Sequence, residues 1–432
     1  MINNELLSNF YQCDKFNYLN FINLTIPQFG FFVKTMNKKF LALSIIVISV
    51  LLLQFTHCQQ AKVNVHPLTN SWEIAVPNQE IPEGLISLSA KDCGTCHQDH
   101  YNEWKLSTHA HAWTDLQFQA ELKKESSPFM CINCHIPLQN QQEYIVEGLI
   151  DGDIYKPVKK KNHKFDFELQ QEGINCASCH VRDGAVIGPT GTTKAPHKTI
   201  KDTSFLSEKL CISCHNATAV ITPTLACTFE TGDEWKSGPF FGKKNCISCH
   251  MEPLNREVVA GFGVRPSRLH YFAGSGIPKL SHLESKQLHG LGFYPSKLQK
   301  SYSLHDSINY TMKIVNEFAG HNVPTGDPER FYNVTFVLRN DKDSILSTQT
   351  EKIGEEWQWY PEAKKLSDNN LKPEEERVFT FSYQANKKEK LSLSVNITKH
   401  RLSQASADYN KLGDNYPLFI TVFEENYDVE IK

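Results

Sequence analysis

One short pattern, Cys-x-x-Cys-His, occurs five times between residues 93 and 250 of this chain. Two thiols three residues apart can reach the two vinyl groups of one haem, and the adjacent histidine can then supply a nitrogen ligand to its iron. The pattern therefore predicts five covalently attached c-type haems. The residues expected to hold them are the thiols of Cys93, Cys96, Cys131, Cys134, Cys176, Cys179, Cys211, Cys214, Cys246 and Cys249, and the imidazoles of His97, His135, His180, His215 and His250.

Two other uses of paired cysteines compete with haem attachment. Zinc knuckles also contain Cys-x-x-Cys, but they need no histidine after each second cysteine, and five pairs leave one without a partner. A thioredoxin-like redox pair has the same spacing, yet one chain rarely needs five. With 13 Cys and 18 His in 432 residues, chance placement gives roughly 0.02 copies of the pattern, so haem attachment is favoured over both alternatives.

Each haem iron has a second axial position, and the histidines outside the motifs are the candidates for it. An iron with two histidines has no free site and relays electrons, whereas an iron with an open face can bind a small molecule. The expected second ligands are His109, His197, His270 and His321, with His111 as the alternative to His109. For each of them, a hydrogen bond to the backbone or to a haem propionate is the competing role. Less favoured are His100, His163, His282, His289, His305 and His400.

The segments that must position these groups are of two kinds. The motifs recur at uneven spacing between residues 91 and 304, among short helical patterns and long loops, and Asp99–Lys124 is expected to be one helix. From about residue 305, six segments alternate apolar and polar residues, with turn residues between them. The expected fold class is α+β, with a loop-rich, mainly helical haem domain over residues 91–304 and an all-β, sandwich-like domain over residues 305–432.

The N-terminal residues resemble a targeting signal. Lys38 and Lys39 precede a short apolar run, so residues 36–58 are expected to be a signal peptide that exports the chain. Residues 1–35 are expected to be a mis-assigned start extension, and residues 59–90 a proline-containing tether.

Cys58 stands where a bacterial lipoprotein signal is cut and lipidated. His57, just before it, departs from the small residue usual there, so a lipid on Cys58, an uncleaved anchor and an ordinary cleavage nearby all stay open. Each of them places the chain in the periplasm or at the cell envelope. The formal net charge of −3 argues against nucleic acid as a partner.

The first motif and the residues after it resemble the cytochrome c-552/c-554 family. The similarity lies in Cys93-x-x-Cys-His followed by Tyr101-x-x-Trp104-x-x-Ser107-x-His109. Similar stretches follow at 173–184, 195–197, 246–253 and 319–326, so the resemblance covers roughly residues 90–330. It implies closely stacked haems, mostly with two histidine ligands, that pass electrons, and it implies His109 as a second ligand.

One position departs from that family pattern. The segment around Trp235 repeats the pattern of the first segment, but Phe240 stands where the first has a histidine. The haem that such a histidine would cap therefore needs another ligand or stays open. The related pentahaem nitrite reductases carry a lysine in their catalytic motif, and none of the five motifs here does.

These patterns predict an exported multihaem cytochrome that relays electrons between redox proteins of the envelope. The activity stays open, with an electron carrier favoured over a catalyst. The alternative is a haem oxidoreductase that acts on a small nitrogen or sulfur compound at one open haem. A weaker hypothesis makes the β domain a docking module for another envelope subunit.

Overall fold

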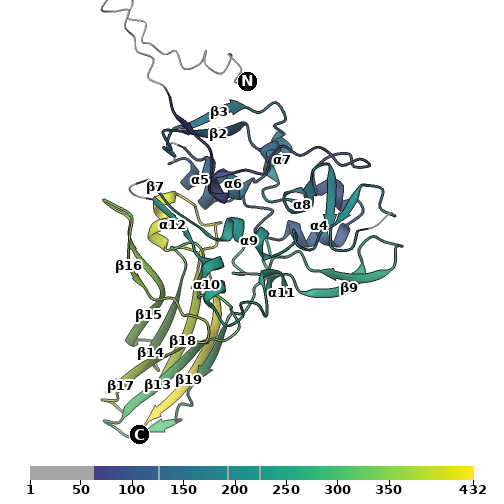
Figure 1. Cartoon of the computed structure of the whole chain (residues 1–432). Helices are drawn as coiled ribbons and strands as arrows, with labels where there is room; N and C mark the ends of the chain where they lie inside the picture. Colours follow the sequence, from purple (N-terminus) through teal and green to yellow (C-terminus); the bar gives the residue numbers. More distant parts are fainter. Residues whose placement is uncertain (1–62, 125–126, 192–193, 223–224) are drawn as a thin grey trace, which may run out of the picture. The chain divides into compact units, whose positions relative to one another are not determined.

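Short helices and hairpins make up the part of the chain that carries the five motifs (Figure 1). The structure is a computed structural model, and it describes residues 63–124, 127–191, 194–222 and 225–432. The helices of this part are α3 (Ala90–Gly94), α4 (Gln98–Lys105), α5 (Leu116–Leu122), α6 (Phe129–His135), α7 (Phe167–Gln171), α8 (Cys176–His180), α9 (Glu208–His215), α10 (Thr231–Ser237) and α11 (Cys246–His250).

Four small sheets separate these helices. They are β1 (Val65–His66) with β2 (Tyr144–Ile150) and β3 (Pro157–Lys161); β4 (Val181–Arg182) with β5 (Ala185–Gly188) and β6 (Thr199–Lys201); β7 (Ala217–Thr222) with β8 (Leu225–Phe229); and β9 (Pro253–Glu257) with β10 (Val264–Arg268). Within the described residues, no helix is both long and apolar enough to cross a bilayer. The predicted start extension and signal peptide, with Cys58, lie outside the described residues.

The single helix predicted over residues 99–124 is wrong, because the structure has α4 and α5 with turns between them. The carbonyl of His109 accepts a hydrogen bond from the backbone N–H of Ile174 (3.0 Å), while Trp104 Nε1 donates to the carbonyl of Ile174 (2.8 Å). Gly173, at φ +59°, lets the two segments approach, since a Cβ there would lie 2.7 Å from the oxygen of His109. A tertiary contact thus replaces the helical hydrogen bond.

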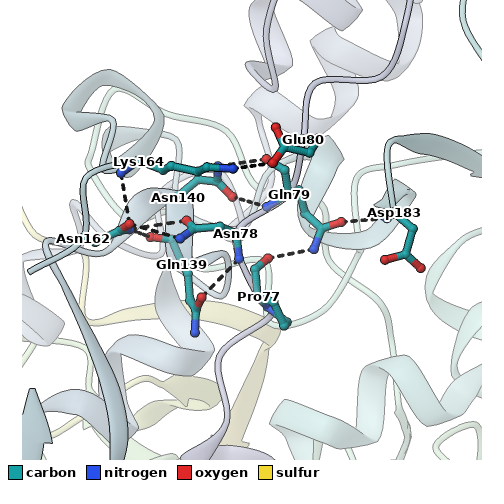
Figure 2. A network of polar contacts seen from close by, with 9 residues as sticks. All are labelled: Pro77, Asn78, Gln79, Glu80, Gln139, Asn140, Asn162, Lys164 and Asp183. Carbon is teal, nitrogen blue, oxygen red and sulfur yellow. Dashed lines mark hydrogen bonds and ion pairs between the residues drawn. The ribbon is translucent and has the colours of Figure 1, made fainter. Parts of the chain in front are cut away.

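Part of the segment expected to be a tether is bonded into the motif-bearing region. The backbone N–H of Asn78 donates to Gln139 Oε1 (3.1 Å). Gln79 exchanges two bonds with Asn140 and accepts a third from the N–H of Asp183 (Figure 2). Gln79 and Asn140 are both buried, so this polar network satisfies groups that would otherwise be costly to desolvate.

The C-terminal part is a sandwich of two antiparallel-dominated sheets. A three-stranded sheet has the order β11-β13-β17, and a six-stranded sheet has the order β12-β19-β18-β14-β15-β16. The strands are β11 (Leu291–Pro295), β12 (Ser301–Tyr302), β13 (Ser307–Asn316), β14 (Phe331–Asn340), β15 (Ile345–Gln358), β16 (Lys364–Asp368), β17 (Glu376–Gln384), β18 (Lys390–His400) and β19 (Phe419–Ile431). About 19% of the residues that the structure describes are helix and 35% are strand, so the predicted α+β class is confirmed.

Alternating residues of the two sheets form the main apolar core. Tyr310 and Met312 of β13 face Phe336 of β14 and Phe381 of β17 within one cluster of buried side chains. This is the period of two that a half-buried strand requires. Because β11 pairs with β13, the sandwich starts before residue 305.

The sandwich contacts the motif-bearing region through its last loop, where α12 (Gln404–Asn410) packs on α5. Tyr416 Oη donates to Asp115 Oδ1 (2.7 Å), and Arg401 Nη2 donates to the carbonyl of Ile277 (2.8 Å). Lys279 also forms an ion pair with Asp115. These buried polar contacts make residues 64–432 one compact unit.

Replacing Phe381 by Ala should lower the free energy of unfolding by about 3–5 kcal/mol, because the side chain is only 1% exposed and its removal leaves a cavity. Denaturant unfolding followed by circular dichroism measures the change. The control is Val378→Ala on the same strand, whose side chain is 54% exposed and which should shift the midpoint little. Equal effects of the two substitutions would contradict the assignment of the core.

Candidate haem-binding site

The five motifs lie on or beside short helices, and local capping explains two of these helices. Asn175 Oδ1 accepts a hydrogen bond from the N–H of Ser178, and Ser178 Oγ accepts one from the N–H of Asn175, each at 3.1 Å. Asn245 and Ser248 make the same reciprocal pair before α11. The sequence Asn-Cys-x-Ser-Cys-His thus forms a capping box that starts the helix at the first cysteine. Both helices end at the histidine.

Backbone carbonyls orient four of the five motif histidines. The Nδ1 atoms of His97, His135, His180 and His250 lie 3.1, 2.7, 2.8 and 2.7 Å from the carbonyl oxygens of Val258, Ala112, Ile187 and Ala273 respectively. A carbonyl oxygen can only accept, so Nδ1 carries the proton and the lone pair of Nε2 is free. This is the arrangement that a metal-binding imidazole requires.

Four motif histidines face a second histidine ring. The centroid distances are 6.5 Å for His97 and His197, 6.3 Å for His215 and His109, 6.2 Å for His180 and His270, and 6.2 Å for His250 and His321. Two imidazoles on opposite sides of one iron, each with a metal–nitrogen bond of about 2 Å, have ring centroids about 6 Å apart. The spacing therefore fits one iron between the rings of each pair.

Three of the four second histidines are also held through Nδ1. Nδ1 of His270 lies 2.9 Å from the carbonyl oxygen of Arg268, and Nδ1 of His321 lies 2.8 Å from that of Asn322. The Nδ1 atom of His197 is hydrogen-bonded to Thr199 Oγ1 (3.1 Å). In each case Nε2 is the nitrogen left for a metal.

The remaining motif histidine, His135 of the second motif, has a different neighbour. Its ring stacks on Phe118, with centroids 3.5 Å apart and planes 8° from parallel. Among the histidines of the described ranges, none pairs with His135 at the spacing found for the other four. An iron held by His135 would therefore lack a second histidine from this part of the chain.

Two of the alternative histidines have Nε2 engaged in other hydrogen bonds. His111 Nε2 lies 3.1 Å from the carbonyl oxygen of Lys105 and donates to it. The ring of His100 lies 6.0 Å from that of His97, but its Nε2 is hydrogen-bonded to Ser267 Oγ (3.0 Å). His109 and His197 therefore fit the second-ligand role better than these neighbours do.

Burial keeps five of these imidazoles in the neutral form that binds a metal. Loss of hydration is the largest cause that lowers the pKa of His109 to about 3, and of His135, His215, His270 and His321 to about 4. A neighbouring histidine lowers the pKa further in most of these cases. The rings are therefore neutral at pH 7, with a lone pair available.

Thiols from different motifs lie close together. The thiol pairs that lie close enough to shift each other's pKa are Cys93 with Cys176, Cys134 with Cys214, and Cys211 with Cys246. The first motif thus adjoins the third, the second adjoins the fourth, and the fourth adjoins the fifth. Rings attached through these sulfur atoms would have neighbouring edges.

Several groups of the site are not visible in the motifs. The carbonyls of Val258, Ala112, Ile187 and Ala273 carry no side-chain signature, so no pattern could have found them. Phe118 is spaced 17 residues before His135, and only the fold brings the two rings together. Glu103 lies within the Tyr101–His109 segment that the sequence singled out. Its hydrogen bond from the backbone N–H of His270 is visible only in the tertiary structure.

Comparisons with known proteins agree with this chemistry. Residues 92–151 match the family model described as "Cytochrome c554 and c-prime", and no curated protein matches the chain. A penta-heme cytochrome c552 from Thermochromatium tepidum has a similar structure, with a TM-score of 0.56 and 15% identity over 81% of this chain and 100% of that one. At this identity the likeness concerns the fold.

Other solved structures are less similar. The CARDB domain of the PF1109 protein from Pyrococcus furiosus aligns with 33% of this chain and 87% of its own, at 14% identity and a TM-score of 0.18. The family model and the penta-heme neighbour together support a multihaem c-type cytochrome of the c554/c552 type. These two likenesses support a haem-based electron-transfer protein with covalently bound haem c.

Replacing His109 by Ala should convert one haem from low spin to high spin, because His215 would lose the ring that faces it at 6.3 Å. Low-temperature EPR of the oxidised protein measures this change. His111→Ala is the matched control, only two residues away, and it should leave the spectrum unaltered. A high-spin signal in the His111 variant and none in the His109 variant would reverse the assignment.

Proposed function

We propose that this chain is an exported electron relay that holds five haems at the cell envelope. The observation that carries the proposal is the set of four facing histidine pairs, each with one member from a Cys-x-x-Cys-His motif. An iron with two histidine ligands has no position for a substrate, and its chemistry is the gain and loss of one electron. The second ligands in this proposal are His197, His109, His270 and His321.

The contacts between motifs support a continuous path. Because thiols of the first and third, second and fourth, and fourth and fifth motifs lie close enough to shift each other's pKa, the haems attached to them would be neighbours within these pairs. Burial of Cys179 beside the fourth motif, whose Cys214 contributes to raising its pKa to about 11, supports a link between the third and fourth. The fourth haem would then be the branch point that joins the others.

The protein's part in this relay is to fix and tune the haems. The buried neutral imidazoles exclude water from both faces of the irons that they bind, and the carbonyls at Nδ1 raise the basicity of the ligand nitrogens. Haem supplies the redox chemistry when bound, while the chain sets each potential through ligand, burial and nearby charge. Export in this proposal rests on the signal-like residues 36–58, and attachment by a lipid on Cys58 is a further option.

Protein purified from its native host should carry the mass of five haems, and a redox titration should resolve four haems with two histidine ligands. Mass spectrometry and low-temperature EPR measure these two quantities. A Cys211→Ala, Cys214→Ala double variant, which removes both attachment thiols of one motif, should lose a single haem. A wild-type mass without multiple haem increments would end the proposal.

A second function is favoured by one observation, the lack of a facing histidine for His135 among the described residues. An open iron there could bind a small nitrogen or sulfur compound, and the other four haems would deliver electrons to it. Lys279 and Asp115 both act electrostatically on His135. This would make the chain an oxidoreductase with an internal relay.

Carbon monoxide should bind the fully reduced protein at one site per chain if the iron at His135 is open. The shift of the visible absorption band on titration gives the stoichiometry. The His109→Ala variant should raise the stoichiometry to two, since it opens the iron at His215 as well. If the wild-type protein binds no carbon monoxide, His135 has a strong second ligand and the catalytic alternative is excluded.

A further inference from the structure

A buried ion pair joins the helix after the first motif to the hairpin after the fifth. Glu103 lies on α4 and Arg256 on β9, and their side chains are only 7% and 11% exposed. Arg256 Nη1 donates to Glu103 Oε1 (2.5 Å) and Nη2 donates to Oε2 (3.0 Å). Asp99 approaches Nη1 only at 3.9 Å and is largely exposed. A buried pair of this kind is weak evidence for stability, because desolvation offsets the attraction.

Both members of the pair also hold the backbone around His270. Glu103 Oε2 accepts a hydrogen bond from the backbone N–H of His270 (2.8 Å), and Arg256 Nη2 donates to the carbonyl of Arg268 (3.1 Å). That same carbonyl accepts the Nδ1–H of His270. The ion pair therefore fixes the two backbone groups that set the position and orientation of this imidazole.

The two segments that carry this ion pair also adjoin the first motif and the group that orients its histidine. Glu103 belongs to the helix that begins directly after His97. Val258, which follows β9 directly, accepts the Nδ1–H of His97 (3.1 Å). The strand that carries Arg256, β9, is thus followed directly by the carbonyl that orients His97. The second strand of the hairpin, β10, ends two residues before His270.

We propose that Glu103 and Arg256 are positioning residues that couple two haems, those of His97 and His180, by fixing their axial ligands and by setting the charge beside them. The proposal rests on the proposed function, because it requires His270 to be the second ligand opposite His180. The carboxylate stabilises the oxidised, more positive iron, and the guanidinium offsets it. In a buried site such charges interact more strongly than in water.

The test is a redox titration of the intact holoprotein with low-temperature EPR at mildly alkaline pH. Glu103→Gln keeps an acceptor for the N–H of His270 but leaves Arg256 without a counter-charge, so the midpoint potential of the haem at His180 should rise. We expect roughly a tenfold change in its reduction equilibrium, which is 59 mV for one electron. Arg256→Met leaves the carboxylate alone and should move the same midpoint in the opposite direction.

Arg256→Lys keeps the charge and loses the paired geometry, so the midpoint should stay near that of the wild type while the EPR signal changes shape. This conservative variant also keeps the test decisive if Arg256→Met fails to fold. Glu376→Gln is the control, since it removes one member of an exposed ion pair with Lys313 in the sandwich. It should change neither the midpoints nor the signals.

His270→Ala separates the two ways in which the inference can fail. If this variant leaves every low-spin signal intact, His270 is no ligand and the proposed pairing fails together with the inference. If it removes one signal, and Glu103→Gln and Arg256→Met shift that haem's midpoint in the same direction or not at all, the pairing stands and the inference is overturned. Opposite shifts in the two charge variants support it.

Discussion

The Nδ1–H to carbonyl hydrogen bond is the interaction on which the rest of the site depends. It decides which imidazole nitrogen keeps a lone pair, and it fixes the plane of the ring. The acceptors come from remote segments, since His97 uses Val258 and His250 uses Ala273. For His97, His135 and His250 the acceptor is at least 23 residues away in the chain, whereas His180 uses Ile187, seven residues away. These bonds tie the motif helices to other segments, and each helix contains too few residues to be stable alone.

The sandwich supplies what the short helices lack, a large apolar core that does not depend on a cofactor. Its loop 317–326 carries His321 to the fifth motif, where the ring lies 17° from parallel to that of His250. Asn316, fully buried at the end of β13, donates to the carbonyl of His321 (2.9 Å), and Thr325 Oγ1 donates to Glu234 on α10 (2.6 Å). The rigid strand end therefore positions the imidazole that faces His250 in a neighbouring, less regular part of the chain. This arrangement gives the sandwich a direct role in the haem site.

The asymmetry among the motif histidines separates two kinds of site within one chain. Four of them face another imidazole across a gap that suits an iron, while His135 lies against the ring of Phe118. Facing imidazoles favour rapid electron exchange, because both oxidation states keep the same ligands and little has to rearrange. An iron with one free position instead exchanges ligands as its charge changes. The same fold can thus combine transport with chemistry at one point.

The amino-acid sequence by itself determined the attachment chemistry and the type of each half of the chain. Cys-x-x-Cys-His is a local pattern, and the alternation in segments such as Phe331–Leu338 is also local, so both were evident without a structure. The break of the helix expected over residues 99–124 was decided by Ile174, more than sixty residues away. Only the tertiary structure decided which histidine faces which, because rings such as His109 and His215 are brought together by chain folding, and spacing along the chain carries no information about that distance.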